Sequence, residues 1–178
     1  MIGLIVNRLI LIILSIFSTS IYAQNFIGKN GTISFYSEAP LENISAINNN
    51  VSAVYDSEKK QLVFQLNIRD FIFPKSLMQE HFNENYLESD IYPKASFNGL
   101  VVSKDNNSVL VNGDLKIHGK TKSISVEGNL IENASFVKIS ANFIIILEEY
   151  NIKIPTIVMY KIAEEIEVKV NIDLKRIK

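Results

Sequence analysis

The sequence contains no cysteine, and it has only seven glycines and four prolines among its 178 residues. Without cysteine, the protein has no disulfide framework, no thiol nucleophile and no cysteine-bound metal. The glycines and prolines occur singly, so no linker rich in either residue divides the chain into domains. The length suits one domain, whose stability must then come from a hydrophobic core alone.

No charge of one sign dominates, since 18 basic and 19 acidic residues give a formal net charge of −1. Proteins that bind nucleic acid usually show a basic stripe. The short lysine-containing segments here, residues 59–60 and 169–178, have acidic residues among or beside them. A nucleic-acid partner is therefore not expected, and the 47% hydrophobic composition is typical of a folded globular protein.

Residues 1–23 are typical of a secretory signal peptide rather than of a folded domain. Arg8 supplies a positive charge, the apolar run 9–17 follows it, and Ala23 places a small residue before the predicted cleavage point. The alternative is an uncleaved anchor, but the apolar run is shorter than the roughly 18 residues of a spanning helix. We expect cleavage after Ala23, a mature domain of residues 24–178 with no membrane span, and a periplasmic or secreted location.

The dominant pattern after residue 23 is the alternation of apolar and polar side chains that marks strands with one buried face. The alternation is clearest in six segments, at residues 32–36, 61–68, 109–118, 123–130, 136–145 and 165–174. Weaker strand signals lie at residues 44–55 and 95–102, and polar turns are predicted at residues 56–60, 105–107 and 119–122. Eight strands with short connections predict an all-β fold, an eight-stranded antiparallel up-and-down barrel.

One stretch, residues 73–87, departs from the strand pattern and has helical spacing. Pro74 stands near its start, a position that helices tolerate. The residues predicted to share one face of this helix are Leu77, Met78, His81, Phe82 and Tyr86. We expect one short amphipathic helix that packs over an opening or a wall of the barrel, and a weaker helical turn at residues 155–161.

The predicted inward faces of the clearest strands carry no charged residue. An eight-stranded barrel either fills its interior with side chains or holds one small ligand, and the same pattern serves both. A cavity of this composition would favour a hydrocarbon chain, because burial contributes roughly 0.8 kcal/mol per CH₂ group. Gly113 and Gly128 also point inward, where they either make room for a ligand or mark a bulge or barrel corner.

Catalytic and metal chemistry have little support in the sequence. The two histidines, His81 and His118, lie far apart and lack a second histidine at ligand spacing. We expect His81 to pack or bond on its helix, and His118 to face solvent or to bond within a turn. Glu148 and Glu149 are adjacent, a poor arrangement for paired acid–base work. No catalytic residue, metal site or cofactor is therefore predicted.

Two motifs carry a resemblance to a known family. Residues 78–87, MQEHFNENYL, followed by residues 92–97, YPKASF, resemble the "HF…YF" and "YP-x-A-x-F" segments of the YceI-like family. Residues 111–122, VNGDLKIHGKTK, are similar to the family's "G-x-L-x-(I/L)-H-G-x-T-K" strand and turn. The chain departs from the family pattern at residues 148–152, EEYNI, where an arginine- or aspartate-containing turn is commoner.

The resemblance implies an exported, lipocalin-like eight-stranded barrel that holds a long polyisoprenoid chain in an apolar tunnel. It places Phe82, Tyr86 and Phe97 near the barrel mouth and His118 and Lys122 in a structural turn. Together with the inward faces of the strands, it predicts a set of ligand contacts: Phe35, Leu66, Phe82, Tyr86, Phe97, Leu115, Val126 and Phe143.

Three functions remain compatible with the sequence. The first is a protein that binds an apolar lipid such as a polyisoprenoid or a quinone-like molecule. The second is a filled barrel with a structural or protein-interaction role in the cell envelope. The third, an enzyme acting on a lipid, has the least support, because no catalytic constellation accompanies the barrel pattern.

Overall fold

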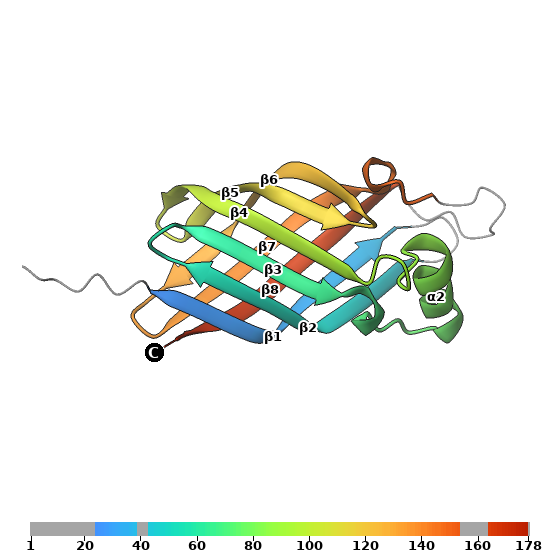
Figure 1. The fold of residues 1–178 in the computed structure, drawn as a ribbon, viewed down its shortest axis with the longest axis horizontal. Coiled ribbons are helices and arrows are strands. Elements are labelled where there is room, and N and C mark those ends of the chain that lie inside the picture. The colour runs from blue at the N-terminus through green and yellow to red at the C-terminus, as the bar shows by residue number, and fades with distance from the viewer. Residues whose placement is uncertain (1–23, 39–42, 154–163, 178) are drawn as a thin grey trace, which may run out of the picture.

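The computed structural model describes residues 24–38, 43–153 and 164–177. The segment predicted to be a signal peptide and the weak helical turn predicted at residues 155–161 lie outside the described residues. The described residues form a closed barrel in which each strand pairs antiparallel with the next and the last strand pairs with the first (Figure 1). The strands are β1 Asn25–Ser37, β2 Ile44–Asp56, β3 Gln61–Asn67, β4 Lys94–Asp105, β5 Ser108–Ile117, β6 Lys120–Glu132, β7 Phe136–Ile146 and β8 Glu165–Arg176. The predicted all-β class, strand number and direction are confirmed.

The strands turn their apolar residues inward with the parity that the sequence predicts. In β3 the buried residues Leu62, Phe64 and Leu66 alternate with polar or exposed neighbours, and β8 repeats the pattern. The first half of β1 was not predicted as strand, because register shifts on both sides of Gly31 and a left-handed Asn30 interrupt its alternation.

The long connection between β3 and β4 contains the helix. A 3₁₀ turn, η1 Ile68–Asp70, precedes the six-residue α2 Ser76–His81, which continues into the π-helical η2 Phe82–Tyr86. The predicted helix at residues 73–87 is confirmed, although it begins at Ser76. Leu77 is 60% exposed rather than on the buried face, because five residues of regular α-helix place it about 140° round the helix axis from Phe82.

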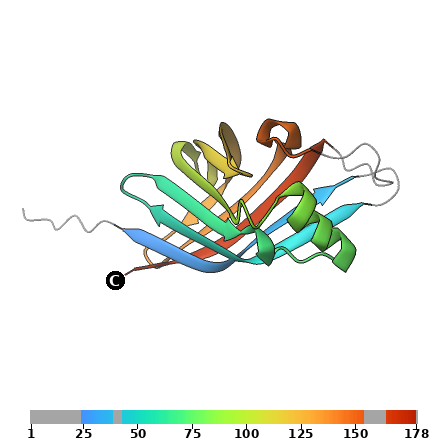
Figure 2. The same ribbon diagram turned by 45° about the vertical axis from the view of Figure 1, so that its right-hand side comes forward.

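The two ends of the barrel differ (Figures 1 and 2). At the end we call the helix end lie α2, the β5–β6 turn and a 3₁₀ turn after β7, η3 Leu147–Tyr150. At the opposite end, the turn end, lie three short hairpins and the beginning of β1 and end of β8. Its interior is closely packed by side chains at most 3% exposed: Phe26, Tyr55, Leu130, Val137 and Leu174.

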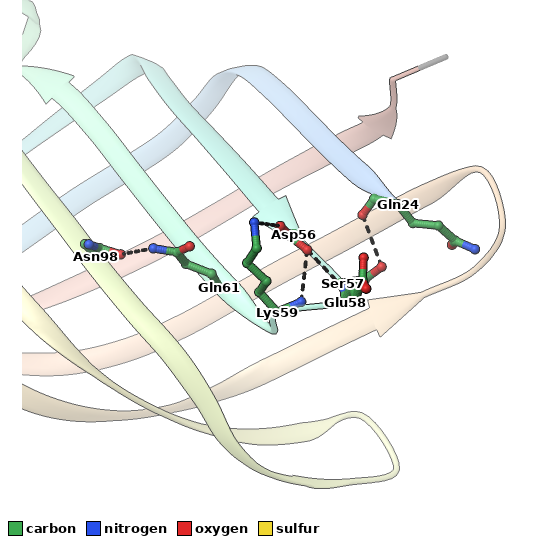
Figure 3. A network of polar contacts seen from close by, with 7 residues as sticks. All are labelled: Gln24, Asp56, Ser57, Glu58, Lys59, Gln61 and Asn98. Atoms are coloured by element: carbon green, nitrogen blue, oxygen red, sulfur yellow. Dashed lines mark hydrogen bonds and ion pairs between the residues drawn. The ribbon is translucent and has the colours of Figure 1, made fainter. Parts of the chain in front are cut away.

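Polar contacts fix the β2–β3 hairpin at the turn end, as Figure 3 shows. The Asp56 carboxylate accepts hydrogen bonds from the backbone N–H groups of Glu58 and Lys59, at 3.1 and 3.0 Å. The Lys59 N–H is the main reason why the pKa of Asp56 lies below its ordinary value. The Ser57 hydroxyl donates to the carbonyl of Gln24, which ties the hairpin to the start of β1. The turn end is thus closed and anchored, whereas at the helix end the β3–β4 and β7–β8 connections are longer and the β5–β6 turn is short.

Candidate ligand-binding site

The centre of the barrel encloses an apolar cavity of about 100 Å³. No charged residue is among those that line it. Five of the eight predicted ligand contacts lie here, one on each of the strands β3 to β7: Leu66, Phe97, Leu115, Val126 and Phe143. An engineered cavity of about 150 Å³ accepts a molecule the size of benzene, so this smaller space does not hold a long chain without rearrangement.

A second cavity of about 40 Å³ lies at the helix end. It collects the other three predicted contacts, Phe35, Phe82 and Tyr86, beside Leu147 and Ile152 from the connection after β7. The predicted residues therefore fall into two groups along the barrel axis rather than around one tunnel.

A cluster of phenylalanine rings separates the central cavity from the helix end. The Phe82 ring packs against those of Phe35, Phe71 and Phe73, with ring centroids 5.7, 5.5 and 4.9 Å apart. Ile33 lines the central cavity, and Phe35, two residues nearer the helix end on β1, lines the smaller one. This cluster, which we call the aromatic plug, stands where a ligand entering from the helix end would have to pass.

Sequence reasoning identified only half of the aromatic plug. Phe71 and Phe73 lie between β3 and α2, and both are buried. Phe71 lies outside every predicted element, and Phe73 begins the predicted helix without belonging to its predicted buried face. The available signal was the density of aromatic residues in the run Phe71-Ile72-Phe73. A lone apolar run next to a helix does not show which way its rings point.

His118 joins three connections at the helix end. Its Nδ1 lies 3.1 Å from the carbonyl oxygen of Tyr150, and its Nε2 lies 2.7 Å from a carboxylate oxygen of Glu88. Both partners offer acceptor oxygens to the imidazole ring. The Tyr92 ring meets the imidazole edge-on, with centroids 4.6 Å apart. The predicted solvent-facing or turn-bonding role is wrong, because the His118 side chain is only 9% exposed and its partners lie in distant connections rather than in its own turn.

The described residues contain no cluster of side chains suited to binding a metal ion. No group of three or more His, Cys, Asp or Glu side chains lies close enough together there to hold an ion. The Nδ1 of His81 instead approaches the amide oxygen of Asn85 at 3.2 Å, one turn along the helix. The predicted local role of His81 therefore matches its geometry.

The inward glycines Gly113 and Gly128 permit close strand approach. A Cβ atom at Gly113 would lie 2.5 Å from the carbonyl oxygen of Asn98, and one at Gly128 would lie 2.7 Å from that of Ser140. No register shift occurs at either residue, so neither marks a bulge. Any side chain at these positions would collide with backbone.

Two buried tyrosines give the barrel a pH dependence in the alkaline range. Burial, with the nearby charge of Glu149, raises the pKa of Tyr150 from 10.0 to about 12, and burial with Glu132 and Asp56 does the same for Tyr55. Between these values the folded protein binds more protons than the unfolded chain. We therefore expect the free energy of unfolding to keep the contribution of these two tyrosines below pH 10 and to fall as the pH rises toward 12.

Urea unfolding on both sides of pH 10 measures this loss. The double variant Tyr55→Phe/Tyr150→Phe is the control, and it should lose less stability over the same interval. A tyrosinate absorbance that rises in one step near pH 10 in the folded protein would contradict the expectation.

Within the described residues, none of the helices has the length and apolar character needed to cross a membrane.

Comparison with known proteins identifies the family. The model of the YceI-like domain matches residues 20–174. Among curated protein sequences, none is significantly similar to this chain. A polyisoprenoid-binding domain from Saccharophagus degradans, implicated in plant cell wall breakdown, is similar in structure with a TM-score of 0.75 at 10% identity, over 88% of this chain and 100% of that one.

Two further solved structures share the fold. BcnA of Burkholderia cenocepacia superposes with a TM-score of 0.70 at 16% identity, over 80% of this chain and 95% of its own. The Campylobacter jejuni YCEI protein does so with a TM-score of 0.62 at 17% identity, over 74% of this chain and 84% of its own. At these identities the likeness shows the barrel fold alone. The family model covers most of the sequence, and this chain belongs to the YceI-like family.

Proposed function

We propose that this protein binds a long apolar lipid, such as a polyisoprenoid or a quinone-like molecule, inside the barrel and performs no catalysis. The observation that carries the proposal is the lining of the central cavity, which contains no charged side chain. Such a lining offers a hydrocarbon chain burial and offers a polar ligand no partner. The similar domain from Saccharophagus degradans, described as polyisoprenoid-binding, supports the same ligand class.

The size of the cavity requires the barrel to adjust. About 100 Å³ at the centre and about 40 Å³ at the helix end cannot hold a chain of tens of carbons. We expect the rings of the aromatic plug to move when the two spaces join, because Phe35, Phe73 and Phe82 line the smaller cavity on the helix-end side of the central one. Entry from the helix end is favoured, because the turn end is packed with fully buried side chains. A ligand that binds the opened state more tightly shifts the population toward it.

A second function is favoured by the same small volumes. A barrel whose interior is already filled by Phe and Ile needs no ligand and could serve a structural or protein-interaction role in the cell envelope. The two proposals differ in one respect, namely whether the aromatic plug opens for a lipid.

Export completes the proposal. Residues 1–23 have the charge and the apolar run of a signal peptide, and β1 begins at Asn25, just beyond the predicted cleavage point. Periplasmic or secreted protein purified after expression with this leader should therefore have a mass that begins at Gln24.

Native mass spectrometry of that same sample tests the ligand. We expect a discrete added mass that extracts into organic solvent as a prenyl or acyl lipid. A mass of protein alone, unchanged after incubation with isoprenoid lipids, would reject lipid binding in favour of the filled barrel.

A further inference from the structure

Two inward glycines face each other in the wall of the central cavity. Gly99 of β4 and Gly113 of β5 are register partners, flanked along their strands by the inward residues Phe97 and Leu115. With no side chain on either, the inner wall has a shallow recess two strands wide. We call this recess, formed by Gly99 and Gly113, the glycine niche.

The ring of Phe97 fills the glycine niche. A Cβ atom at Gly99 would lie 2.7 and 2.8 Å from the ring atoms Cζ and Cε1 of Phe97, and one at Gly113 would lie 2.7 Å from the same Cζ. The tip of the ring therefore occupies the space that a Cβ atom at either glycine would need. Phe97 still lines the central cavity and is only partly buried.

We propose that the glycine niche sets the bore of the barrel by holding the Phe97 ring against the wall, which makes Phe97 a specificity-determining residue. The inference rests on the proposed function, because it concerns which chains the cavity accepts. With the ring in the niche, the central cavity keeps room beside this wall for part of a slender acyl or prenyl chain. With the niche filled, the ring must turn into the lumen and occupy the space that the chain needs.

The two glycines are not equivalent. The closest neighbours of a Cβ at Gly99 are side-chain atoms, namely the Phe97 ring and Cγ1 of Val111 at 2.9 Å. A Cβ at Gly113 would instead meet backbone, at 2.5 Å from both the Asn98 carbonyl oxygen and the Gly99 Cα. Gly99 does not have a left-handed φ, so alanine suits its backbone. Gly99→Ala should therefore displace the ring, whereas Gly113→Ala would force the strands apart.

The test compares Gly99→Ala, Phe97→Leu and the double variant Gly99→Ala/Phe97→Leu with the original protein. The probe is cis-parinaric acid, a slender fatty acid whose fluorescence rises on burial. Gly99→Ala should weaken its binding about tenfold, the effect of losing room for roughly two methylene groups. Phe97→Leu should bind the probe more tightly than the original protein, because the smaller side chain leaves more room for the chain in the cavity. The double variant should regain the affinity that Gly99→Ala loses, because leucine is too short to be pushed into the lumen.

A second measurement separates this inference from lipid binding itself. Xenon enters apolar cavities lined by aliphatic and aromatic residues, and its effect on methyl NMR signals of Leu115 and Val126 reports the free space. The effect should shrink in Gly99→Ala and grow in Phe97→Leu. If it does so while no form binds parinaric acid, the niche stands and the proposed function fails. If the original protein binds the probe and a folded Gly99→Ala matches it in both measurements, the niche is rejected and the proposed function stands. Failure of the double variant to recover would also reject the niche.

Discussion

Replacing Phe143 with glutamate is expected to abolish lipid binding, with at least a hundredfold loss of affinity. Phe143 lies on the inner face of β7 and lines the central cavity, where no charged residue offers a carboxylate a partner. A lipid in the cavity would either lie against a carboxylate stripped of water or have to leave room for the water molecules that hydrate the carboxylate. Either requirement removes more free energy than a few methylene contacts supply.

The neighbouring residue provides a matched control. Ile144 follows on the same strand, is 61% exposed and points outward, so Ile144→Glu places the same charge in water. Its cross-strand neighbour Glu167 adds only a weak repulsion, because water screens both charges on this exposed face. Binding of the extracted lipid, measured by native mass spectrometry, should persist in this variant.

A second inward variant tests the same cavity from another strand, in case the first variant fails to fold. Leu66→Asp places a charge on β3, which stands across the barrel from β7 in the strand order. Circular dichroism shows whether each variant keeps its sheet. Normal lipid uptake by either folded variant would overturn the assignment of these residues to the ligand site.

Truncating Leu130 to alanine is expected to cost about 3 kcal/mol of unfolding free energy. Leu130 is 0% exposed, near the closed turn end of β6. The loss combines the transfer of its methyl groups to water with a void that the surrounding rigid strands cannot fill. Urea unfolding, followed by circular dichroism, gives this value directly.

Ile131→Ala is the corresponding outward change. Ile131 is 43% exposed, and its truncation should cost less than about 1 kcal/mol. Equal losses at both positions would show that the inner and outer faces of β6 are not distinguished as the barrel requires.

The strands were predictable wherever a single face is buried along their whole length. In β3 and β8 every second residue is apolar and enters the core, so period-two alternation locates the strand and its inward face together. The start of β1 escaped prediction because Gly28, Asn30 and Gly31 interrupt the alternation. A bulge depends on how two strands pair, so the alternation within one strand does not predict it.

The candidate site was predictable residue by residue but not as an arrangement. Inward parity correctly placed Leu66 and Phe143 beside the central cavity. It did not show that Phe35 and Phe82 stack near the helix end, nor that Phe71 and Phe73 complete the plug. Those contacts join an irregular connection to the barrel, and they depend on tertiary folding rather than on periodicity. The predicted leader lies outside the described residues, so export stays a prediction.

The pairing of β1 with β8 has a consequence for how the chain folds. Registered partners such as Ile33 and Val170 lie at opposite ends of the domain sequence, so closure must join segments separated by nearly the whole domain. Contacts of this separation are slow to form, because the entropy of a large loop is lost before any pairing is gained. Until β8 arrives, both β1 and β7 present unpaired edges that invite association with other chains. β8, the last of the eight strands along the chain, thus closes the barrel and ends the stage of folding at which unpaired edges most favour aggregation.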